Sequence, residues 1–324
     1  MGEHEETPHF DTVDGRTRHF GQFYGLLPVA SDRPVVVVHG NCQAESTRIM
    51  LDADDVTAVR IPPVHELVAT DLPYLERLLR RTDLLVTQPV RDGYRDLPLG
   101  TAELSALLPT TARVVRVPVI RFAGLYPFHA IIRPPSDPSL SPPIAAYHDL
   151  RTLVAASAPG TRDPGEQEGV DAASAPTPAT RDQVLAIANL SCAELRRREQ
   201  HHDTVRVSDV FDAPDFAQMR TINHPGNAVW TAVAARVREA AGLEPRDTDP
   251  GRPLLDSIHA PRSSAVMEAF DLAGEPTDHW VIGGERVDDA VVRAAHLAWY
   301  REHPDAVAAG ITRHADSLRL LGLA

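Results

Sequence analysis

Residues 34–51 read PVVVVHGNCQAESTRIML. The four consecutive valines form a short β-branched apolar run, which predicts a strand buried on both faces. Gly40 and Asn41 break this run, and residues 44–51 have the composition of a helix. This order of strand, turn and helix places Cys42 near a helix N-terminus, at the carboxyl end of a strand. Open α/β sheets bind their ligands at that edge.

The position of Cys42 makes it a candidate nucleophile. The N–H groups and the macrodipole of a first helical turn favour an anion, so we expect this thiol to ionise more easily than a free cysteine. The alternative is that Cys42 packs as a small apolar residue, as buried cysteines often do. The polar neighbours Asn41 and Gln43, and the similarity of the turn to a nucleophile elbow, favour the functional interpretation.

Strand and helix patterns alternate along the first half of the chain. Residues 56–61 and 83–87 predict two further strands, and residues 113–120 predict a fourth. Between the second and third strands, residues 72–79 carry leucines at helical spacing. Such alternation indicates a parallel sheet with helices on its faces. Pro118 places the fourth strand at an edge or marks a bulge.

We therefore expect an α/β fold, with a short parallel sheet flanked by helices and followed by a mostly helical C-terminal part. Composition divides the chain into four predicted parts: a flexible arm over 1–20, an α/β part over 21–154 with the Cys42 turn, a mobile insert over 155–181, and a mostly helical part over 182–324 with His224. The insert is rich in Ala, Pro, Gly, Thr and Asp and has little to bury.

A second candidate for catalysis lies in the stretch NHPGN at residues 223–227. Proline restricts the backbone after His224, glycine permits an unusual angle, and Asn227 can cap a helix predicted over 228–241. Because the pKa of histidine lies near working pH, His224 can act as a general base toward Cys42 or toward an acceptor. The alternative is a turn histidine that hydrogen-bonds only to the backbone.

Four stretches, in this order, resemble the WcbI-type polysaccharide-biosynthesis acetyltransferase family, over roughly residues 34–300 with a gap in the middle. They are GNCQ at 40–43, DLLVTQP at 83–89 with Tyr94, VPVIRFAGLYP at 117–127, and NHPGN at 223–227. The resemblance implies acetyl transfer, with coenzyme A or acetyl-CoA as the acyl donor and a sugar hydroxyl as the acceptor. The same chemistry also serves amines and small natural products.

Two mechanisms are compatible with these residues. In one, the Cys42 thiolate attacks the acyl thioester and His224 supplies the base, while backbone N–H groups after Gly40 stabilise the oxyanion together with Asn41 or Gln43. In the other, Cys42 only shapes the pocket and His224 deprotonates the acceptor directly. The residues expected to bind substrate or coenzyme A are Gly40, Asn41, Gln43, Gln88, Tyr94, Arg121, Tyr126 and Asn223.

Two of these assignments, Gln88 and Arg121, have ordinary alternatives. Gln88 follows a strand on the same predicted edge as Cys42, where it can contact a thioester or simply cap the strand. Arg121 is suited to phosphate, although a solvated arginine is the common case. Tyr126 and His129, two candidate ligand contacts, lie in the aromatic stretch 122–132, which we interpret as a pocket wall.

The composition excludes several classes of function. The net charge of −13 argues against a nucleic-acid partner. All 32 basic residues other than histidine are arginine, which excludes a lysine Schiff base and a P-loop lysine. The two cysteines, Cys42 and Cys192, provide neither a disulfide framework nor a multi-cysteine zinc site, and no metal is expected. Cys192 is expected on a helix, as a residue of the hydrophobic core.

The chain has no apolar run of the roughly 20 residues that span a bilayer, and its first ten residues do not resemble a secretory signal. We expect a soluble, cytoplasmic protein. Two other classes of function use the same residues: a thioesterase or esterase-type thiol hydrolase, with water as acceptor, and a non-catalytic module that binds an acyl thioester. An acyl carrier protein is the alternative donor to coenzyme A.

Overall fold

The computed structural model describes residues 14–158 and 177–324, and contacts divide the chain into two compact units. The first unit comprises Met1–Val119, Arg198–Arg206 and Trp230–Arg252. The second unit comprises Ile120–Arg197, Val207–Val229 and Pro253–Ala324. Each unit is assembled from separate stretches of chain, whereas the division based on composition is contiguous.

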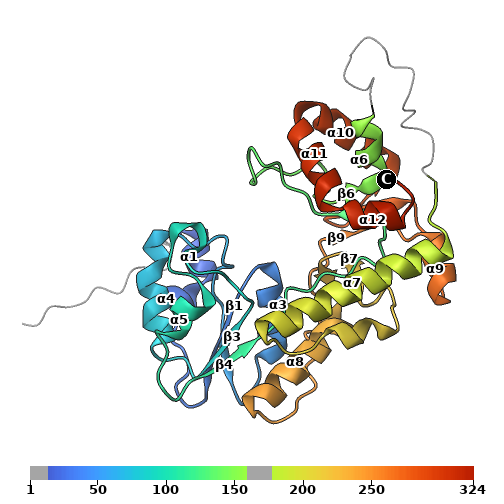
Figure 1. Cartoon of the computed structure of the whole chain (residues 1–324). Coiled ribbons are helices and arrows are strands. Elements are labelled where there is room, and N and C mark those ends of the chain that lie inside the picture. Colours follow the sequence, from blue (N-terminus) through green and yellow to red (C-terminus); the bar gives the residue numbers. More distant parts are fainter. Residues whose placement is uncertain (1–13, 159–176) are drawn as a thin grey trace, which may run out of the picture. The chain divides into compact units, whose positions relative to one another are not determined.

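The first unit is built on a four-stranded parallel sheet (Figure 1). Its strands are β1 (Val35–His39), β2 (Thr57–Val59), β3 (Leu84–Thr87) and β4 (Arg113–Arg116), in the order β2-β1-β3-β4. Every residue of β1 and β3 is buried, as expected for central strands covered on both faces. The predicted sheet is confirmed. β4 is an edge strand that ends before Pro118, because proline has no N–H for the ladder.

Helices cover both faces of this sheet. Figure 1 shows α4 (Leu72–Leu79) and α5 (Thr101–Ser105) on one side and α3 (Cys42–Leu51) on the other. Alternate residues of β1, Val35 and Val37, belong to one core cluster with apolar residues of α4, α5 and the short helix α2 (Gly21–Tyr24). Two short 3-10 helices complete the unit, η2 (Ala69–Asp71) and η3 (Tyr94–Asp96).

The predicted flexible arm is wrong for its described part. Residues 14–20 contain helix α1 (Gly15–His19), and the Asp14 carboxylate accepts the N–H groups of Arg16 and Thr17, each at 3.0 Å. Phe20 follows and is buried in the core. A helix of five residues is too short to produce an apolar periodicity, which is why its sequence resembles a loop. Residues 1–13 lie outside the described part of the chain.

The C-terminal part of the chain is mostly helical, as predicted, and most of it belongs to the second unit. The helices of the second unit are α6 (Leu150–Ser157), α7 (Arg181–His202, up to Arg197), η4 (Ser208–Asp212), α9 (Ser264–Phe270), α10 (Asp289–Glu302), α11 (Pro304–Arg313) and α12 (Ala315–Leu320). Helix α8 (Asn227–Ala241) is counted with the first unit from Trp230 onward. The ends of the predicted insert belong to α6 and α7, while residues 159–176 of that insert lie outside the described residues.

Short antiparallel strands accompany these helices. They are β5 (His129–Ala130) with β6 (His148–Asp149), β7 (Met219–Thr221) with β8 (His224–Pro225), and a sheet ordered β11-β10-β9 from Glu285–Asp288, His279–Ile282 and Ile258–His259. The β10–β11 hairpin was not predicted. Its signal is the pair Gly283 and Gly284, which take the positive φ angles of a tight hairpin turn.

Within the two described ranges, no helix combines the length and the apolar composition that crossing a bilayer requires.

Two fully buried histidines make the stability of the protein sensitive to acid. Burial lowers the pKa of His39 to about 4 and that of His148 to about 3. Each is neutral when folded but binds a proton near pH 6.5 when unfolded, so acid favours unfolding. We expect the free energy of unfolding in urea to fall by about 1.4 kcal/mol per histidine for each pH unit between about 6.5 and 4. His39→Gln should reduce this slope, and an unchanged slope would contradict the argument.

Candidate active site

The turn that carries Cys42 is held at the carboxyl ends of β1 and β3. Asn41 is the N-cap of α3, and its Oδ1 accepts the Gln43 N–H at 2.9 Å. Gln88 follows β3; its Oε1 accepts the Asn41 N–H at 2.8 Å, and its Nε2 donates to Gln43 Oε1 at 3.2 Å. Because β1 and β3 are neighbouring parallel strands, both segments reach the same sheet edge, as predicted.

Gly40 allows Gln88 to approach this closely. A Cβ atom at position 40 would lie 2.8 Å from Cδ and 2.9 Å from Cγ of Gln88, whose side chain is only 3% exposed. The side-chain hydrogen bonds described above join Asn41, Gln43 and Gln88 to one another. The Asn41 N–H, one of the groups considered for an oxyanion, therefore already has an acceptor, and the contact of these residues with a ligand stays a prediction.

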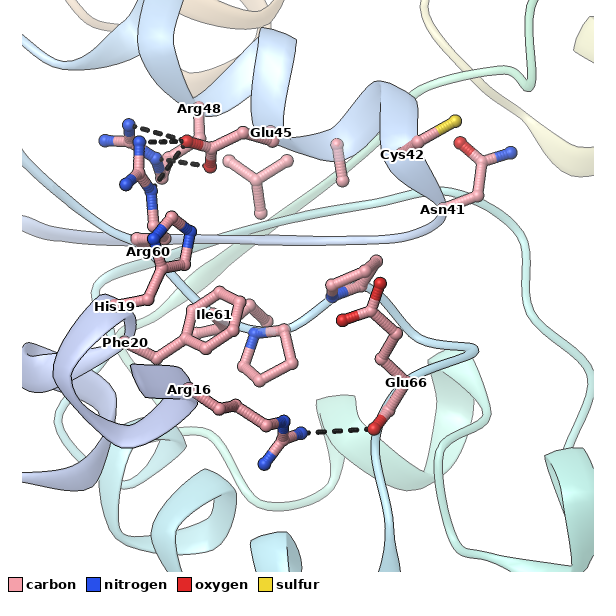
Figure 2. A pocket seen from close by; sticks show the side chains of 14 residues that line it. Arg16, His19, Phe20, Asn41, Cys42, Glu45, Arg48, Arg60, Ile61 and Glu66 are labelled. Atoms are coloured by element: carbon pink, nitrogen blue, oxygen red, sulfur yellow. Dashed lines mark hydrogen bonds and ion pairs between the residues drawn. The ribbon is translucent and has the colours of Figure 1, made fainter. Parts of the chain in front are cut away.

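Cys42 is exposed at the first residue of α3. It lines a cavity of about 390 Å³ together with Asn41 (Figure 2). Desolvation by the surrounding atoms raises the pKa of the thiol, and the N–H groups of Cys42 and Gln43 only partly oppose this. The expectation of an easily ionised thiol is wrong, because the helix terminus does not offset the desolvation.

The raised pKa predicts how Cys42 reacts with alkylating agents. Since the thiolate is the reactive form, we expect its alkylation by iodoacetamide to accelerate with pH beyond the ordinary thiol pKa of about 8.5. Intact-mass measurement of the rate between about pH 6 and 10 would test this. Cys192, which is buried in α7, is the internal control. A rate that reaches its plateau below about pH 8 would contradict the assignment.

His224 lies in β8 of the second unit, where its ring meets Tyr147 edge-on at a centroid distance of 6.1 Å. The Tyr147 hydroxyl donates to Asn223 Oδ1 at 2.6 Å and accepts from Thr221 Oγ1 at 2.9 Å. Burial, with Arg220 and His259 adding to it, lowers the pKa of His224 to about 4. The imidazole is therefore neutral at pH 7. Its buried Nδ1 has no hydrogen-bond partner within the described ranges.

The segment after His224 is held tightly. A Cβ atom on Gly226 would run into the Ala217 carbonyl, and the Gly226 N–H donates to Gln218 O at 2.7 Å. Helix α8 begins at Asn227, one residue earlier than predicted, and Asn227 Oδ1 accepts the Leu254 N–H at 2.9 Å. His224 thus sits in a rigid turn ahead of a helix. Its pairing with Cys42, a residue of the first unit, stays a prediction.

The family model described as "Polysaccharide biosynthesis enzyme WcbI" matches residues 35–246. The chain belongs to the WcbI family of polysaccharide biosynthesis enzymes. This confirms the resemblance drawn from the four motifs, all of which lie within the matched residues. Comparison with curated proteins found no match.

A solved structure of WcbI resembles this chain with a TM-score of 0.70 at 19% sequence identity. The alignment covers 89% of this chain and 99% of the WcbI chain. That structure is described as a novel polysaccharide biosynthesis enzyme, the native protein without a disulfide bond between coenzyme A and one of its cysteines. The likeness confirms the fold.

The remaining predicted site residues of this WcbI-family chain lie at two further cavities and at the start of the second unit. Tyr94 lines a cavity of about 640 Å³ in the first unit. Tyr126 and His129 line a cavity of about 750 Å³ in the second unit, and the Tyr126 hydroxyl donates to Met219 O at 2.9 Å. Arg121 is half-buried at the start of the second unit. Burial and the charge of Arg313 lower the pKa of His314, and the charge of Arg121 adds to this effect.

Sequence reasoning missed the other side of the Cys42 cavity. Arg16, His19 and Phe20 line it from the segment interpreted as an arm, and Glu66 lines it from a loop. No motif marks these residues, and the first three precede the residues matched by the WcbI family. Among the described residues, no group of three or more His, Cys, Asp or Glu side chains is arranged to hold a metal ion.

Proposed function

We propose that this WcbI-family enzyme is an acyltransferase. It transfers an acyl group, most simply acetyl, from coenzyme A to a hydroxyl or amine of a saccharide or small natural product. The observation that carries the proposal is the exposed Cys42, held at the N-terminus of α3 on the wall of a cavity of about 390 Å³. This is the strand–turn–helix placement of a nucleophile.

Coenzyme A is the proposed donor for two reasons. The description of the solved WcbI structure refers to a disulfide between coenzyme A and a cysteine of that protein. We assign the corresponding role to Cys42, since the other cysteine of this chain, Cys192, is buried in α7. A disulfide of that kind requires the coenzyme A sulfur to reach the cysteine, which is also the position of a reacting thioester.

The cavity at Tyr94 suits the phosphates of the donor. Pro89, the residue after Gln88, lines this cavity. Arg91, Arg116 and His202 line it as well. The ion pair of Arg116 with Asp203 is long, at 4.0 Å. In a chain without lysine, arginine guanidinium groups are the expected partners of phosphate.

In the proposed reaction, the Cys42 thiol transfers its proton to a base and the thiolate attacks the thioester carbonyl. The carbon–sulfur bond to coenzyme A then breaks, and coenzyme A leaves with a proton. The acceptor loses its own proton to the base and takes the acyl group from Cys42, which restores the thiol. The raised pKa of Cys42 makes a base necessary at pH 7. We propose the neutral imidazole of His224 for this role.

Two measurements distinguish this function from its alternatives. The full chain is incubated with acetyl-CoA, with and without a set of saccharides, and free coenzyme A and acetylated product are followed by mass spectrometry. We expect an acceptor to increase coenzyme A release at least about tenfold. Equal release without acceptor would indicate a thiol hydrolase. Binding of acetyl-CoA without any release would indicate a non-catalytic module.

A further inference from the structure

The β7–β8 hairpin that carries His224 is held by a tyrosine that no sequence motif marks. Thr221 and His224 are paired across this hairpin, and Ile222 and Asn223 form its two-residue loop. Tyr147 directly precedes β6 and lies 76 positions before Asn223 in the chain. All of these residues belong to the second unit. Two segments that are far apart in the sequence therefore meet at the candidate base.

The Tyr147 hydroxyl ties the two sides of the hairpin loop together. It accepts a hydrogen bond from Thr221 Oγ1 at 2.9 Å and donates one to Asn223 Oδ1 at 2.6 Å. Tyr147 is 5% exposed and Thr221 is fully buried, so removal of the hydroxyl would leave buried polar groups without these bonds. Because His224 directly follows Asn223, the same bonds restrict the backbone from which the imidazole projects.

The Tyr147 ring also contacts the imidazole. The two ring planes meet at 89° with their centroids 6.1 Å apart, which is the edge-on arrangement that aromatic pairs favour. Trp280 of β10 stacks on Tyr147, at 6.0 Å and 16°. Trp280 is 2% exposed, and its Nε1 donates to Asp289 Oδ1 at 2.9 Å. The ring that contacts His224 is therefore packed against a neighbour that is itself fixed.

His224 lacks the hydrogen bond that usually orients a reactive histidine. Its Nδ1 is buried and, within residues 14–158 and 177–324, has no hydrogen-bond partner. In many sites this nitrogen donates to a carboxylate or a carbonyl, which sets the orientation of the ring. Because Nδ1 is sealed from solvent, Nε2 is the nitrogen that can exchange a proton. The orientation of the ring must then come from packing.

We propose that Tyr147 is the positioning residue of His224. Its hydroxyl fixes the hairpin loop through Thr221 and Asn223, and its ring fixes the plane of the imidazole, so that Nε2 is presented in one orientation. The inference rests on the proposed function, because it concerns the base of that reaction. It also gives Asn223, which the sequence predicts to bind a ligand, a role in supporting the base.

Tyr147→Phe tests the hydroxyl while keeping the ring. Acetyl transfer gives kcat and KM, and peptide mass spectrometry gives the rate at which diethyl pyrocarbonate modifies His224 at pH 7. We expect kcat to fall about tenfold, with KM for acetyl-CoA changed by less than about twofold. Modification of His224 should accelerate about threefold or more, because a looser hairpin exposes the imidazole.

Three further variants separate positioning from a general loss of stability. Thr221→Val removes the other hydroxyl of the pair and should change kcat and the modification rate in the same directions, whereas Thr221→Ser keeps that hydroxyl and should restore both. Tyr300→Phe is the matched control. It loses a buried hydrogen bond of the same length, 2.6 Å to His148 Nδ1, and should leave kcat and the modification of His224 unchanged.

In a parent protein that transfers acetyl groups, the inference is overturned if Tyr147→Phe keeps the parent kcat or the parent reactivity of His224. It is also overturned if Tyr300→Phe has the same effects. Should Tyr147→Phe fail to fold, the two Thr221 variants provide the same test.

The proposed function fails separately, if the parent protein transfers no acetyl group to any acceptor. The modification rate then decides alone. Faster modification of His224 in Tyr147→Phe would support the positioning role without the acyltransferase, and an unchanged rate would remove it.

Discussion

Replacing Cys42 by serine is expected to abolish the acetyl adduct that forms with acetyl-CoA and to slow acyl transfer at least about 100-fold. A serine hydroxyl has a far higher pKa than a thiol, and the desolvation that already raises the pKa of Cys42 would disfavour an alkoxide still more. The substitution is nearly isosteric at an exposed position, so the fold should be unaffected. Intact mass after incubation with acetyl-CoA measures the adduct, and product formation measures transfer.

The second cysteine provides the matched control. Cys192→Ser removes the same sulfur from a buried position on α7. We expect this variant to keep both the adduct and the transfer rate. If Cys42→Ser transfers acetyl at the full rate, the covalent mechanism is eliminated, and the version in which His224 deprotonates the acceptor for direct attack takes its place.

His224→Gln separates the base from the nucleophile. Glutamine keeps the size and polarity of the side chain but cannot take a proton, so acyl transfer should slow by about 100-fold or more at pH 7. The imidazole stays neutral down to about pH 4, so the parent enzyme should keep its base in the active form throughout the range from pH 5 upward. If the parent enzyme and His224→Gln both lost activity around pH 6.5, the role of His224 as the base would be contradicted.

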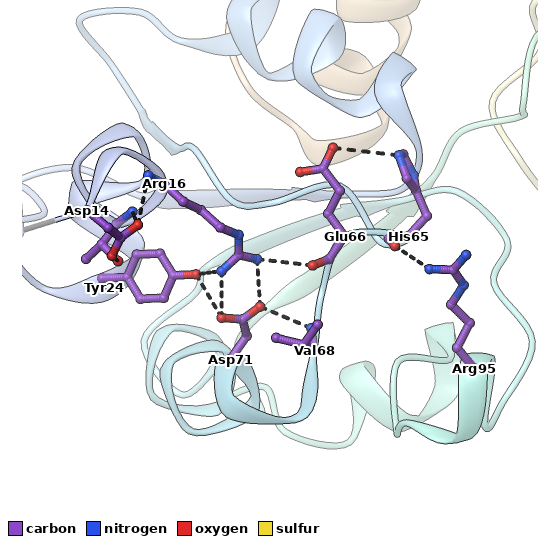
Figure 3. A network of polar contacts seen from close by, with 9 residues as sticks. Asp14, Arg16, Tyr24, His65, Glu66, Val68, Asp71 and Arg95 are labelled. Atoms are coloured by element: carbon purple, nitrogen blue, oxygen red, sulfur yellow. Dashed lines mark hydrogen bonds and ion pairs between the residues drawn. The ribbon is translucent and has the colours of Figure 1, made fainter. Parts of the chain in front are cut away.

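The sheet of the first unit could be predicted because its signals are local. Runs of β-branched and apolar residues produced β1 and β3, and leucine spacing gave α4 with the bounds that the structure has, Leu72–Leu79. Helix α1 was missed for the opposite reason, because it is held by contacts to distant residues, such as that of Arg16 with Asp71, 55 positions along the chain (Figure 3). A short window of sequence cannot contain such contacts. The β10–β11 hairpin was missed although its signal is local, the pair Gly283 and Gly284 in its turn.

In the candidate site, too, features with a local sequence signal could be predicted, and features that depend on packing could not. The position of Cys42 at a helix start could be predicted from the strand and the turn alone. Its raised pKa could not, because desolvation depends on the atoms that folding packs around the sulfur. Gln88 was placed at the correct edge, but the hydrogen bonds that join it to Asn41 and Gln43 depend on its side-chain conformation. The residues that line the cavity across from Cys42, among them Arg16, His19 and Phe20, come from a segment without any chemical motif.

Gly40→Ala is expected to lower the free energy of unfolding by about 2–4 kcal/mol, because the new methyl group meets the buried side chain of Gln88. Gln88 must then leave its place, which removes the acceptor of the Asn41 N–H and loosens the turn that presents Cys42. The rate of Cys42 alkylation should change in parallel. Gly15→Ala is the matched control, since no atom lies within 4 Å of the added carbon there, and its effect should stay within about 0.5 kcal/mol.

The double variant decides whether Gln88 is the residue that Gly40 accommodates. Gln88→Ala alone loses the hydrogen bonds to Asn41 and Gln43 and leaves buried polar groups without them. It also vacates the space that the methyl group of Gly40→Ala needs. We therefore expect the double variant to be about 1–2 kcal/mol more stable than the sum of the single effects, measured by urea unfolding. Strict additivity would mean that the two positions do not meet, and Gln88 would then have no part in supporting Cys42.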